Sequence, residues 1–419
     1  MRVLFAIFPA TAHLYPVVPL AWALHNQGHE VRVAVHPSMN DAVARTGLTA
    51  LPFGDNETVR HVVGFNSDPD KLKSLTTDLS LRCVPDEPWH DAWLGTIATF
   101  TIYASVLDEL VDVCREWGPD LVVWDPLCVP AAIAAEATGA AHARFLWGQD
   151  NVGWMWERYA ERDPEQTPVA VDGSVHWLLG EHLARHGVEL SPSLFVGQWT
   201  IEPRPDRWAV PTTLDRLPLR SVPHNGGGHV PDWVRAPRER PRVVLSLGIG
   251  GRGRELFAES GLTHTGLVRR LSELDIELVV TLAHKDFDGP LPGNVRVVDY
   301  VPLNQVLPDC AAIIHHGGDG TALAAGTFGV PQLVVPVPFW AEDNVADHIA
   351  DQGAGLVVRP AELTGDAPDD VLADALSQLL TEERFAKSAA EFREELRGQP
   401  SPAELVPLLE ERVARHRRR

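Results

Sequence analysis

A glycine-rich turn beside two histidines is the part of this sequence best suited to hold an anion. It is the run HHGGDGT at residues 315–321, which follows an apolar strand pattern and precedes a helical run of small residues. At the start of a helix the backbone N–H groups have no intrahelical partner and the dipole is positive, which favours an anion. His316 and Thr321 would add side-chain donors. Gly317 and Gly318 would let the backbone approach the ligand without a Cβ between them.

The same run has an ordinary alternative, a tight strand-to-helix connection with Asp319 as the helix cap. A lone glycine-rich turn carries little specificity. The paired histidines favour a ligand site, and so does the polar cluster Glu342, Asp343 and Asn344 after the next apolar run. Ligands of open parallel sheets bind at the carboxyl ends of the strands, where both features are expected.

Two polar residues in the first half of the chain are also expected at strand ends. His13 follows the apolar run 3–8, and Asp125 directly follows the run LVVW. An imidazole is a candidate general base for a hydroxyl, and a carboxylate bound to one of its nitrogens would fix the tautomer and stabilise the imidazolium. Either residue could instead cap the following helix, and the residues alone leave both interpretations open.

The elements around these residues alternate between short apolar runs and helical patterns, which predicts doubly wound parallel sheets of an α/β protein. The first unit begins with a strand at 3–8, a loop at 9–15 that carries His13, and a helix at 16–27. A further short strand is expected at 145–147. The 419 residues are too many for one ordinary core and suggest two domains. The expected division is an N-terminal domain at 1–205, a proline- and glycine-rich linker at 206–240, a C-terminal domain at 241–385, and C-terminal helices at 386–419 that pack back across the domains.

Composition narrows the class of protein. A hydrophobic content of 45% and a charged content of 22% are typical of a soluble globular enzyme, and the net charge of −21 argues against a nucleic-acid partner. No apolar run is long enough to span a membrane. The four cysteines show no metal-binding spacing, so reduced thiols in a cytoplasmic protein are expected and no metal site is predicted.

Two further patterns have competing interpretations. Gly248 begins GIGGRG after an apolar run, which fits a dinucleotide-binding loop, but the next strand ends without the carboxylate that would bind a ribose. A phosphate-facing loop without nicotinamide is therefore the simpler interpretation. Trp147, Trp154 and Trp156 lie in WGQDNVGWMWERY, where they could line an apolar acceptor pocket or form core.

These residues together resemble a known family. The runs PLAWAL, GHEVRVA, HARFLWGQD, GQWTIEP, CAAIIHHGG and QPSPAELV are similar to those of GT-B glycosyltransferases that use nucleotide sugars to modify natural products. The last four resemble most the actinomycete TDP-deoxysugar transferases of macrolide and polyketide biosynthesis, of the erythromycin, desosamine and forosamine type. The resemblance implies a GT-B fold, with two Rossmann-like doubly wound domains facing across a cleft.

The resemblance also implies roles for individual residues. His13 matches the family's catalytic base and Asp125 the carboxylate that supports it. Tyr300 would pack against the nucleotide base and the Val301 backbone would contact the edge of that base. In many relatives the tryptophan at position 340 is followed by Asp-Gln, whereas here Ala341 and Glu342 follow. The implied donor-binding residues are Gly248, Tyr300, Val301, His316, Gly317, Gly318, Thr321, Trp340 and Glu342, and the implied acceptor-binding residues are Trp147 and Trp154.

The expected activity is inverting transfer of a deoxysugar from a TDP-sugar to a hydroxyl of a macrolide or polyketide aglycone. It is a hexosyltransferase-type reaction without a cofactor or metal. The acid Asp319 beside a diphosphate suggests pairing with a cationic amino-sugar. The resemblance also suggests a cytochrome-P450-like activator protein as a partner, and a homodimer stays open. The alternatives are a non-catalytic or helper-dependent nucleotide-sugar-binding protein and an NAD-dependent oxidoreductase.

Overall fold

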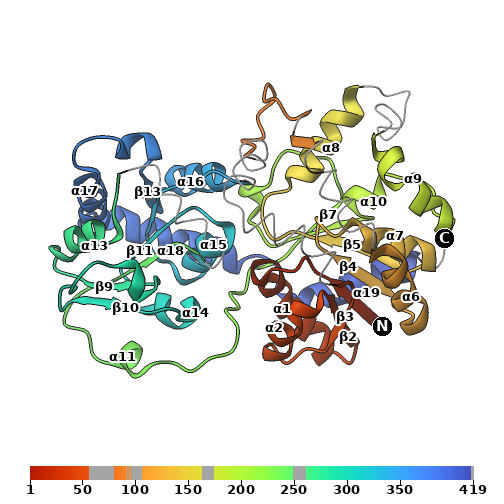
Figure 1. Cartoon of the computed structure of the whole chain (residues 1–419), viewed down its shortest axis with the longest axis horizontal. Coiled ribbons are helices and arrows are strands. Elements are labelled where there is room, and N and C mark those ends of the chain that lie inside the picture. Colours follow the sequence, from red (N-terminus) through yellow and green to blue (C-terminus); the bar gives the residue numbers. More distant parts are fainter. Residues whose placement is uncertain are drawn as a thin grey trace. The chain divides into compact units, whose positions relative to one another are not determined.

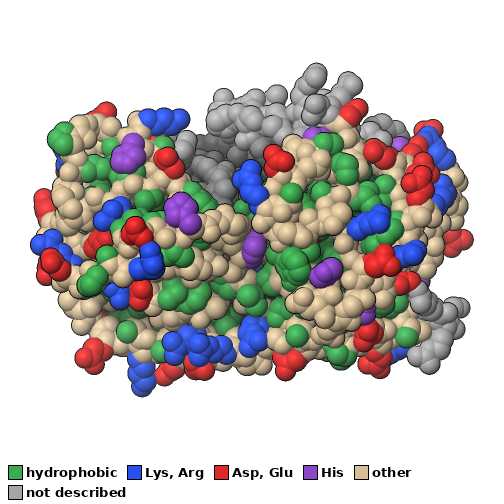
Figure 2. Space-filling view, turned by 90° about the horizontal axis from the view of Figure 1, so that it is seen from below, with side chains coloured by type: hydrophobic (Ala, Val, Ile, Leu, Met, Phe, Trp, Pro, Cys, Tyr) green, Lys and Arg blue, Asp and Glu red, His purple; other side chains and the backbone are tan. Residues whose placement is uncertain are grey.

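The computed structural model describes residues 1–55, 80–90, 92–93, 96, 106–162, 174–248 and 261–416. The chain forms two compact units, each built on one parallel sheet (Figure 1). Unit 1 comprises Met1–Arg220 and Gln399–Arg419, and unit 2 comprises Ser221–Gly398. The C-terminal helix therefore belongs to the same unit as the N-terminal strand. On the face drawn in Figure 2, acidic and basic side chains are interspersed, and the described residues there form no continuous basic surface.

The sheet of unit 1 has the strand order β3-β2-β1-β4-β5-β6-β7, and all its paired strands are parallel. Four of the five residues of β1 are fully buried, as expected for a strand covered by helices on both faces. The strands are β1 (Arg2–Ala6), β2 (Glu30–Val35), β3 (Ala50–Pro52), β4 (Leu121–Trp124), β5 (Ala141–Phe145), β6 (Thr200–Glu202) and β7 (Arg216–Pro218).

The helices of unit 1 connect these strands and bury their apolar faces on the sheet. The C-terminal helix packs against the first helix, and its Leu405, Leu409 and Val413 enter the same core cluster as the strands. The helices are α1 (Thr11–Asn26), α2 (Asn40–Arg45), α6 (Leu107–Trp117), α7 (Val129–Thr138), α8 (Asn151–Arg162), α9 (Ser174–His186), α10 (Ser193–Val196) and α19 (Pro402–His416), with the 3₁₀ turns η1 (Pro37–Met39) and η3 (Asp206–Trp208).

The sheet of unit 2 has the order β10-β9-β8-β11-β12-β13 and is also parallel. Its strands are β8 (Arg242–Ser246), β9 (Glu277–Val280), β10 (Val295–Val297), β11 (Ala312–His315), β12 (Gln332–Val334) and β13 (Gly355–Val357). Its helices are α11 (Asp232–Arg235), α13 (His264–Ser272), α14 (Leu303–Val306), α15 (Asp319–Phe328), α16 (Glu342–Asp351), α17 (Pro368–Thr381) and α18 (Glu383–Arg397), with η5 (His284–Asp286), η6 (Leu307–Asp309) and η7 (Pro360–Leu363).

Each sheet reverses its strand order at one place. In unit 1 the reversal lies between β1 and β4, and in unit 2 it lies between β8 and β11. The connections diverge at such a switch point, which leaves room for a ligand at the carboxyl ends of the two strands. His13 and Asp125 follow β1 and β4, and Gly248 and His316 follow β8 and β11. The topology therefore brings the predicted residues together in pairs.

Three sequence predictions differ from the structure. Helix α1 begins at Thr11, so His13 lies in its first turn and the predicted loop 9–15 is wrong. Pro16 and Pro19 lie inside that helix, where each removes a backbone hydrogen bond. Burial of its apolar residues against the sheet offsets this loss.

The other two differences concern strands. The predicted strand 145–147 is wrong because β5 ends at Phe145 and leaves Trp147 in the following loop. Strand β7 lies within the segment expected to be a linker, and its Leu217 pairs with Ile201 of β6. Such a three-residue strand shows too little alternation to be recognised in sequence.

Candidate active site

An imidazole and a carboxylate meet at the switch point of unit 1. Strand β1 leads through Pro9 and Ala10 into α1, whose third residue is His13. Asp125 directly follows β4, and its N–H donates to the Ala6 carbonyl at 3.0 Å. The His13 Nδ1 lies 2.6 Å from the Asp125 Oδ2, and the two side chains are 11% and 2% exposed. The pair is thus almost fully buried.

The carboxylate of Asp125 fixes the tautomer of His13. An ionised carboxylate only accepts hydrogen bonds, so the Nδ1 of His13 carries the proton and Nε2 keeps its lone pair. The other oxygen of Asp125 accepts from the Leu127 N–H at 2.9 Å. Asp125 thus holds the imidazole and organises the turn before α7, but it does not cap that helix, whose N-cap is Cys128 without a side-chain bond. His13 does not cap a helix, because the N-cap of α1 is Ala10 without a side-chain bond.

Two aromatic rings contact His13. The ring centroid of Phe8 lies 4.8 Å from that of His13, and the ring centroid of Trp147 lies 4.3 Å away with a tilt of 44°. Trp154 differs, because it is fully buried on α8 with the Arg158 guanidinium over its ring. The structure therefore brings Trp147 to the imidazole, while an acceptor-binding role for either tryptophan stays a prediction.

His315, the first of the two histidines, forms a hydrogen bond with the backbone of the glycine turn in unit 2. The Gly317 N–H donates to His315 Nδ1 at 3.1 Å, and His315 Nε2 lies 2.9 Å from the Gln332 Oε1. Because Nδ1 accepts, Nε2 carries the proton and donates to Gln332. Burial, with a contribution from His316, lowers the pKa of His315 to about 3, so the ring is neutral. The Gly317 N–H therefore donates its hydrogen bond to a group within the protein.

The second histidine lies between two glycines. A Cβ added to Gly248 would lie 2.5 Å from His316 Cε1, and a Cβ added to Gly318 would lie 2.8 Å from its Nε2. Gly248 also has a φ of +79°, which favours glycine. The close packing of His316 thus explains why both positions are glycine. The later glycines of GIGGRG, Gly250 and Gly253, lie outside the described residues.

Helix α15 begins at this turn with Gly318 as its N-cap and no side-chain capping bond. The capping role considered for Asp319 is therefore not observed. Asp319 is the first helical residue instead, where the helix dipole stabilises a negative charge. Thr321 follows two residues later, and its N–H donates to the Gly318 carbonyl at 3.1 Å.

Glu342 organises the loop after β12. Its Oε2 accepts from the N–H groups of Phe339, Trp340 and Ala341 at 2.9, 2.7 and 3.1 Å, and the residue is 8% exposed. The same residue packs beneath the glycine turn, since a Cβ added to Gly317 would lie 3.0 Å from the Glu342 Cβ. The carboxylate therefore holds the Trp340 loop in shape. Its direct contact with a donor sugar stays a prediction.

The remaining predicted donor residues lie after β10. Tyr300 is 47% exposed, and its hydroxyl donates to the Asn225 carbonyl. Val301 is buried. The Asn304 N–H donates to the Asn225 side chain at 3.0 Å, which fixes this loop against residues 223–225. Tyr300 thus lies at the surface of unit 2, and its stacking on a nucleotide base stays a prediction.

The described ranges contain no group of three or more histidine, cysteine, aspartate or glutamate residues placed to hold a metal ion. All four cysteines of the chain are described and free. Among the helices of the described part of the chain, none has the length and apolar character needed to cross a bilayer.

Two parallel-sheet Rossmann-like units, each with its candidate residues at a switch point, define the GT-B class of glycosyltransferases. Solved structures of that class resemble the chain over its whole length. The spinosyn forosaminyltransferase SpnP is 38% identical with a TM-score of 0.80, and 99% of each chain is covered. The glycosyltransferase VinC, solved in complex with dTDP, is 36% identical with a TM-score of 0.84, and 99% of this chain and 100% of VinC are covered.

The chain belongs to the erythromycin biosynthesis protein CIII-like family, whose N-terminal domain matches residues 22–248 and whose C-terminal domain matches residues 265–412. Two relatives are the aclacinomycin-T 2-deoxy-L-fucose transferase of Streptomyces galilaeus and the 10-deoxymethynolide desosaminyltransferase of Streptomyces venezuelae. The first is 40% identical over 100% of this chain and 97% of the relative, and the second is 39% identical over 100% and 98%. The chain is a glycosyltransferase, and the oxidoreductase interpretation of GIGGRG is set aside.

Sequence reasoning missed the supporting contacts of both sites. His315 was interpreted as one of two histidines at a ligand site and Gln332 was not identified as its partner, although a histidine at the end of an apolar run is a signal for a buried polar pair. Arg144 and Asp150 were also missed, although an arginine inside the strand pattern AHARF is a comparable signal.

Proposed function

We propose that this glycosyltransferase moves a deoxysugar from a TDP-sugar to a hydroxyl of a polyketide aglycone, with inversion at the anomeric carbon. The names of its relatives support the substrate classes. They include transferases of deoxyfucose, desosamine and mycaminose, and a TDP-daunosamine transferase. The observation that carries the mechanism is the 2.6 Å contact between His13 and Asp125, because it prepares one imidazole nitrogen as a base.

On the acceptor side, His13 Nε2 takes the proton of the aglycone hydroxyl as its oxygen attacks the anomeric carbon. Asp125 keeps the Nδ1 proton and stabilises the imidazolium that forms. The bond from the anomeric carbon to the diphosphate oxygen breaks, and TDP leaves with the electron pair. A single displacement of this kind inverts the configuration. A positioned general base contributes about 10²–10⁴-fold to the rate.

On the donor side, the developing charge of the diphosphate would face the N-terminus of α15. His316 and Thr321 would donate to it, and the dipole of the ten-residue helix would add to their effect. Tyr300 would stack on the base, the Val301 backbone would contact its edge, and Trp340 would lie by the sugar. The leaving group is stabilised by fixed donors in this scheme, so the scheme uses no metal or cofactor.

We also place the reaction in the cytoplasm, because free cysteines persist in reducing compartments. Dependence on a cytochrome-P450-like activator protein and formation of a homodimer stay predictions. Both are tested by repeating the transfer assay with such a protein and by measuring the mass of the protein in solution.

The test is transfer by the purified protein with TDP-desosamine or TDP-daunosamine and a panel of 10-deoxymethynolide, tylactone and aklavinone, followed by mass spectrometry. We expect His13→Ala to lower the rate by about 10²–10⁴-fold and to leave TDP affinity unchanged. Asp125→Asn should also lower the rate, because an amide can donate to Nδ1 and favour the wrong tautomer. A His13→Ala protein with wild-type transfer would contradict the proposal.

A further inference from the structure

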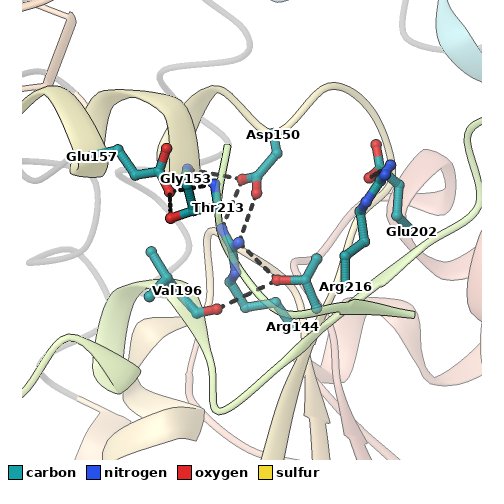
Figure 3. A network of polar contacts seen from close by, with 9 residues as sticks. Arg144, Asp150, Gly153, Glu157, Val196, Glu202, Thr213 and Arg216 are labelled. Atoms are coloured by element: carbon teal, nitrogen blue, oxygen red, sulfur yellow. Dashed lines mark hydrogen bonds and ion pairs between the residues drawn. The ribbon is translucent and has the colours of Figure 1, made fainter. Parts of the chain in front are cut away.

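A buried ion pair in unit 1 closes the loop that carries Trp147. Both terminal nitrogens of Arg144 donate to Asp150, each at 2.7 Å, and one of them also donates to Thr200 Oγ1 at 2.8 Å. The Arg144 side chain is fully buried and that of Asp150 is 8% exposed. Figure 3 shows the two side chains facing each other. The pair thus has the planar two-bond geometry that makes an arginine–carboxylate contact specific.

The ion pair joins both ends of a short loop. Arg144 lies in β5 and Asp150 precedes α8, so residues 146–149 are held between them. Asp150 also fixes the start of α8, since its Oδ1 accepts from the Gly153 N–H at 2.8 Å. A Cβ added to Gly153 would lie 2.3 Å from the Asp150 Oδ2, so helix and carboxylate are in close contact. The loop has little freedom at either end.

Trp147 lies in the middle of this loop and contacts His13 at a ring-centroid distance of 4.3 Å. We propose that Arg144 and Asp150 are positioning residues that hold Trp147 against His13 and thereby fix the orientation of the base. This inference rests on the proposed function, because it assigns a task to the contact only if His13 takes a proton.

A buried ion pair is in general not a strong source of stability. Removing an arginine and a carboxylate from water costs free energy, and apolar residues of the same volume are often as stable or more stable. A fixed geometry is the property that apolar residues would not supply. The contact also has a chemical consequence, because a tryptophan ring attracts a cation such as the imidazolium that forms during transfer. Loss of the ring should lower the rate about 2- to 30-fold.

The experiment is a double-mutant cycle on kcat. Arg144→Lys keeps the charge but loses the two-bond contact, Thr200→Val removes one hydrogen bond of Arg144, and Trp147→Leu removes the ring. Arg216→Lys is the matched control, since Arg216 pairs with Glu202 at 2.9 Å in the same sheet and holds no part of the loop. Folding of each variant is checked by circular dichroism, and TDP affinity by calorimetry.

We expect Arg144→Lys to lower kcat about tenfold, within the range for loss of the ring, and Thr200→Val to lower it less. Neither change should alter TDP affinity, and Arg216→Lys should leave kcat unchanged. With Trp147→Leu present, Arg144→Lys should change kcat by less than about twofold, because coupled residues are not additive. Additive effects would overturn the proposal, as would an unchanged kcat in Arg144→Lys. If Arg144→Lys does not fold, Thr200→Val in the same cycle decides by the same criteria.

His13→Ala separates this inference from the proposed function. If His13→Ala keeps wild-type transfer, the proposed function fails. If His13→Ala is inactive while Arg144→Lys and Trp147→Leu act additively, only the positioning role fails.

Discussion

Replacing Gly248 by alanine perturbs the proposed donor site through one contact. The new Cβ would lie 2.5 Å from His316 Cε1, closer than such atoms approach in folded proteins, so the imidazole must move. The left-handed backbone at φ +79° adds a strain of about 1–2 kcal/mol. If His316 donates to the diphosphate, its displacement removes a hydrogen bond to a charged group, worth about 1.5–3 kcal/mol. TDP affinity should therefore fall about 10- to 160-fold.

The matched control is Gly289→Ala in the same unit. Gly289 has a φ of +72°, and its nearest neighbour, Arg269 Nη2, would lie 3.7 Å from the new Cβ, which is ordinary contact. The control thus carries the backbone strain without the collision. Calorimetry with TDP and thermal unfolding of both variants separate the two effects.

We expect Gly248→Ala to lose at least as much stability as Gly289→Ala, and only Gly248→Ala to bind TDP more weakly. Wild-type TDP affinity in a folded Gly248→Ala protein would contradict a role of His316 in binding TDP. It would mean either that His316 does not contact the diphosphate or that the turn does not bind it.

Two other contacts of unit 2 give predictions. Glu342→Ala leaves three backbone N–H groups without their acceptor, so its free energy of unfolding in urea should fall by about 2–4 kcal/mol. The control Glu362→Ala removes one exposed hydrogen bond from the Arg359 N–H and should cost under about 1 kcal/mol. Equal losses would contradict the organising role of Glu342. The pKa of His315 is about 3 in the folded chain and 6.5 ordinarily, so the unfolded chain binds the proton first as pH falls. Protonation of His315 in the unfolded chain therefore lowers the free energy of unfolding progressively as the pH falls from 6.5 toward 3. The loss is about 2 kcal/mol at pH 5. His315→Asn should therefore lose less stability than the wild type between pH 7 and pH 5, and parallel curves would refute this.

The sequence predicted the residues at the strand ends better than the elements that carry them. His13 and Asp125 are 112 residues apart, yet the rule that ligands bind at strand carboxyl ends placed both at one edge, where they meet at 2.6 Å. The helix that carries His13 was predicted at 16–27, but its start was placed at Pro16 and not at Thr11, because a proline in a sequence indicates a helix start or a break. Packing against the sheet overrides that local signal.

The role of Glu342 shows what sequence cannot decide. A glutamate after Trp340 fits a sugar ligand as well as a loop organiser, and only the three N–H groups around its Oε2 reveal the organising role. The same holds for Arg144, whose partners Asp150 and Thr200 come from the end of the following loop and from another strand. Such contacts depend on tertiary geometry, which periodicity does not report.

The most direct test of the account is a crystal structure of the protein with TDP bound. We expect the diphosphate to contact the N-terminus of α15, with His316 and Thr321 donating to it and Tyr300 against the base. A diphosphate bound away from residues 316–321 would contradict it.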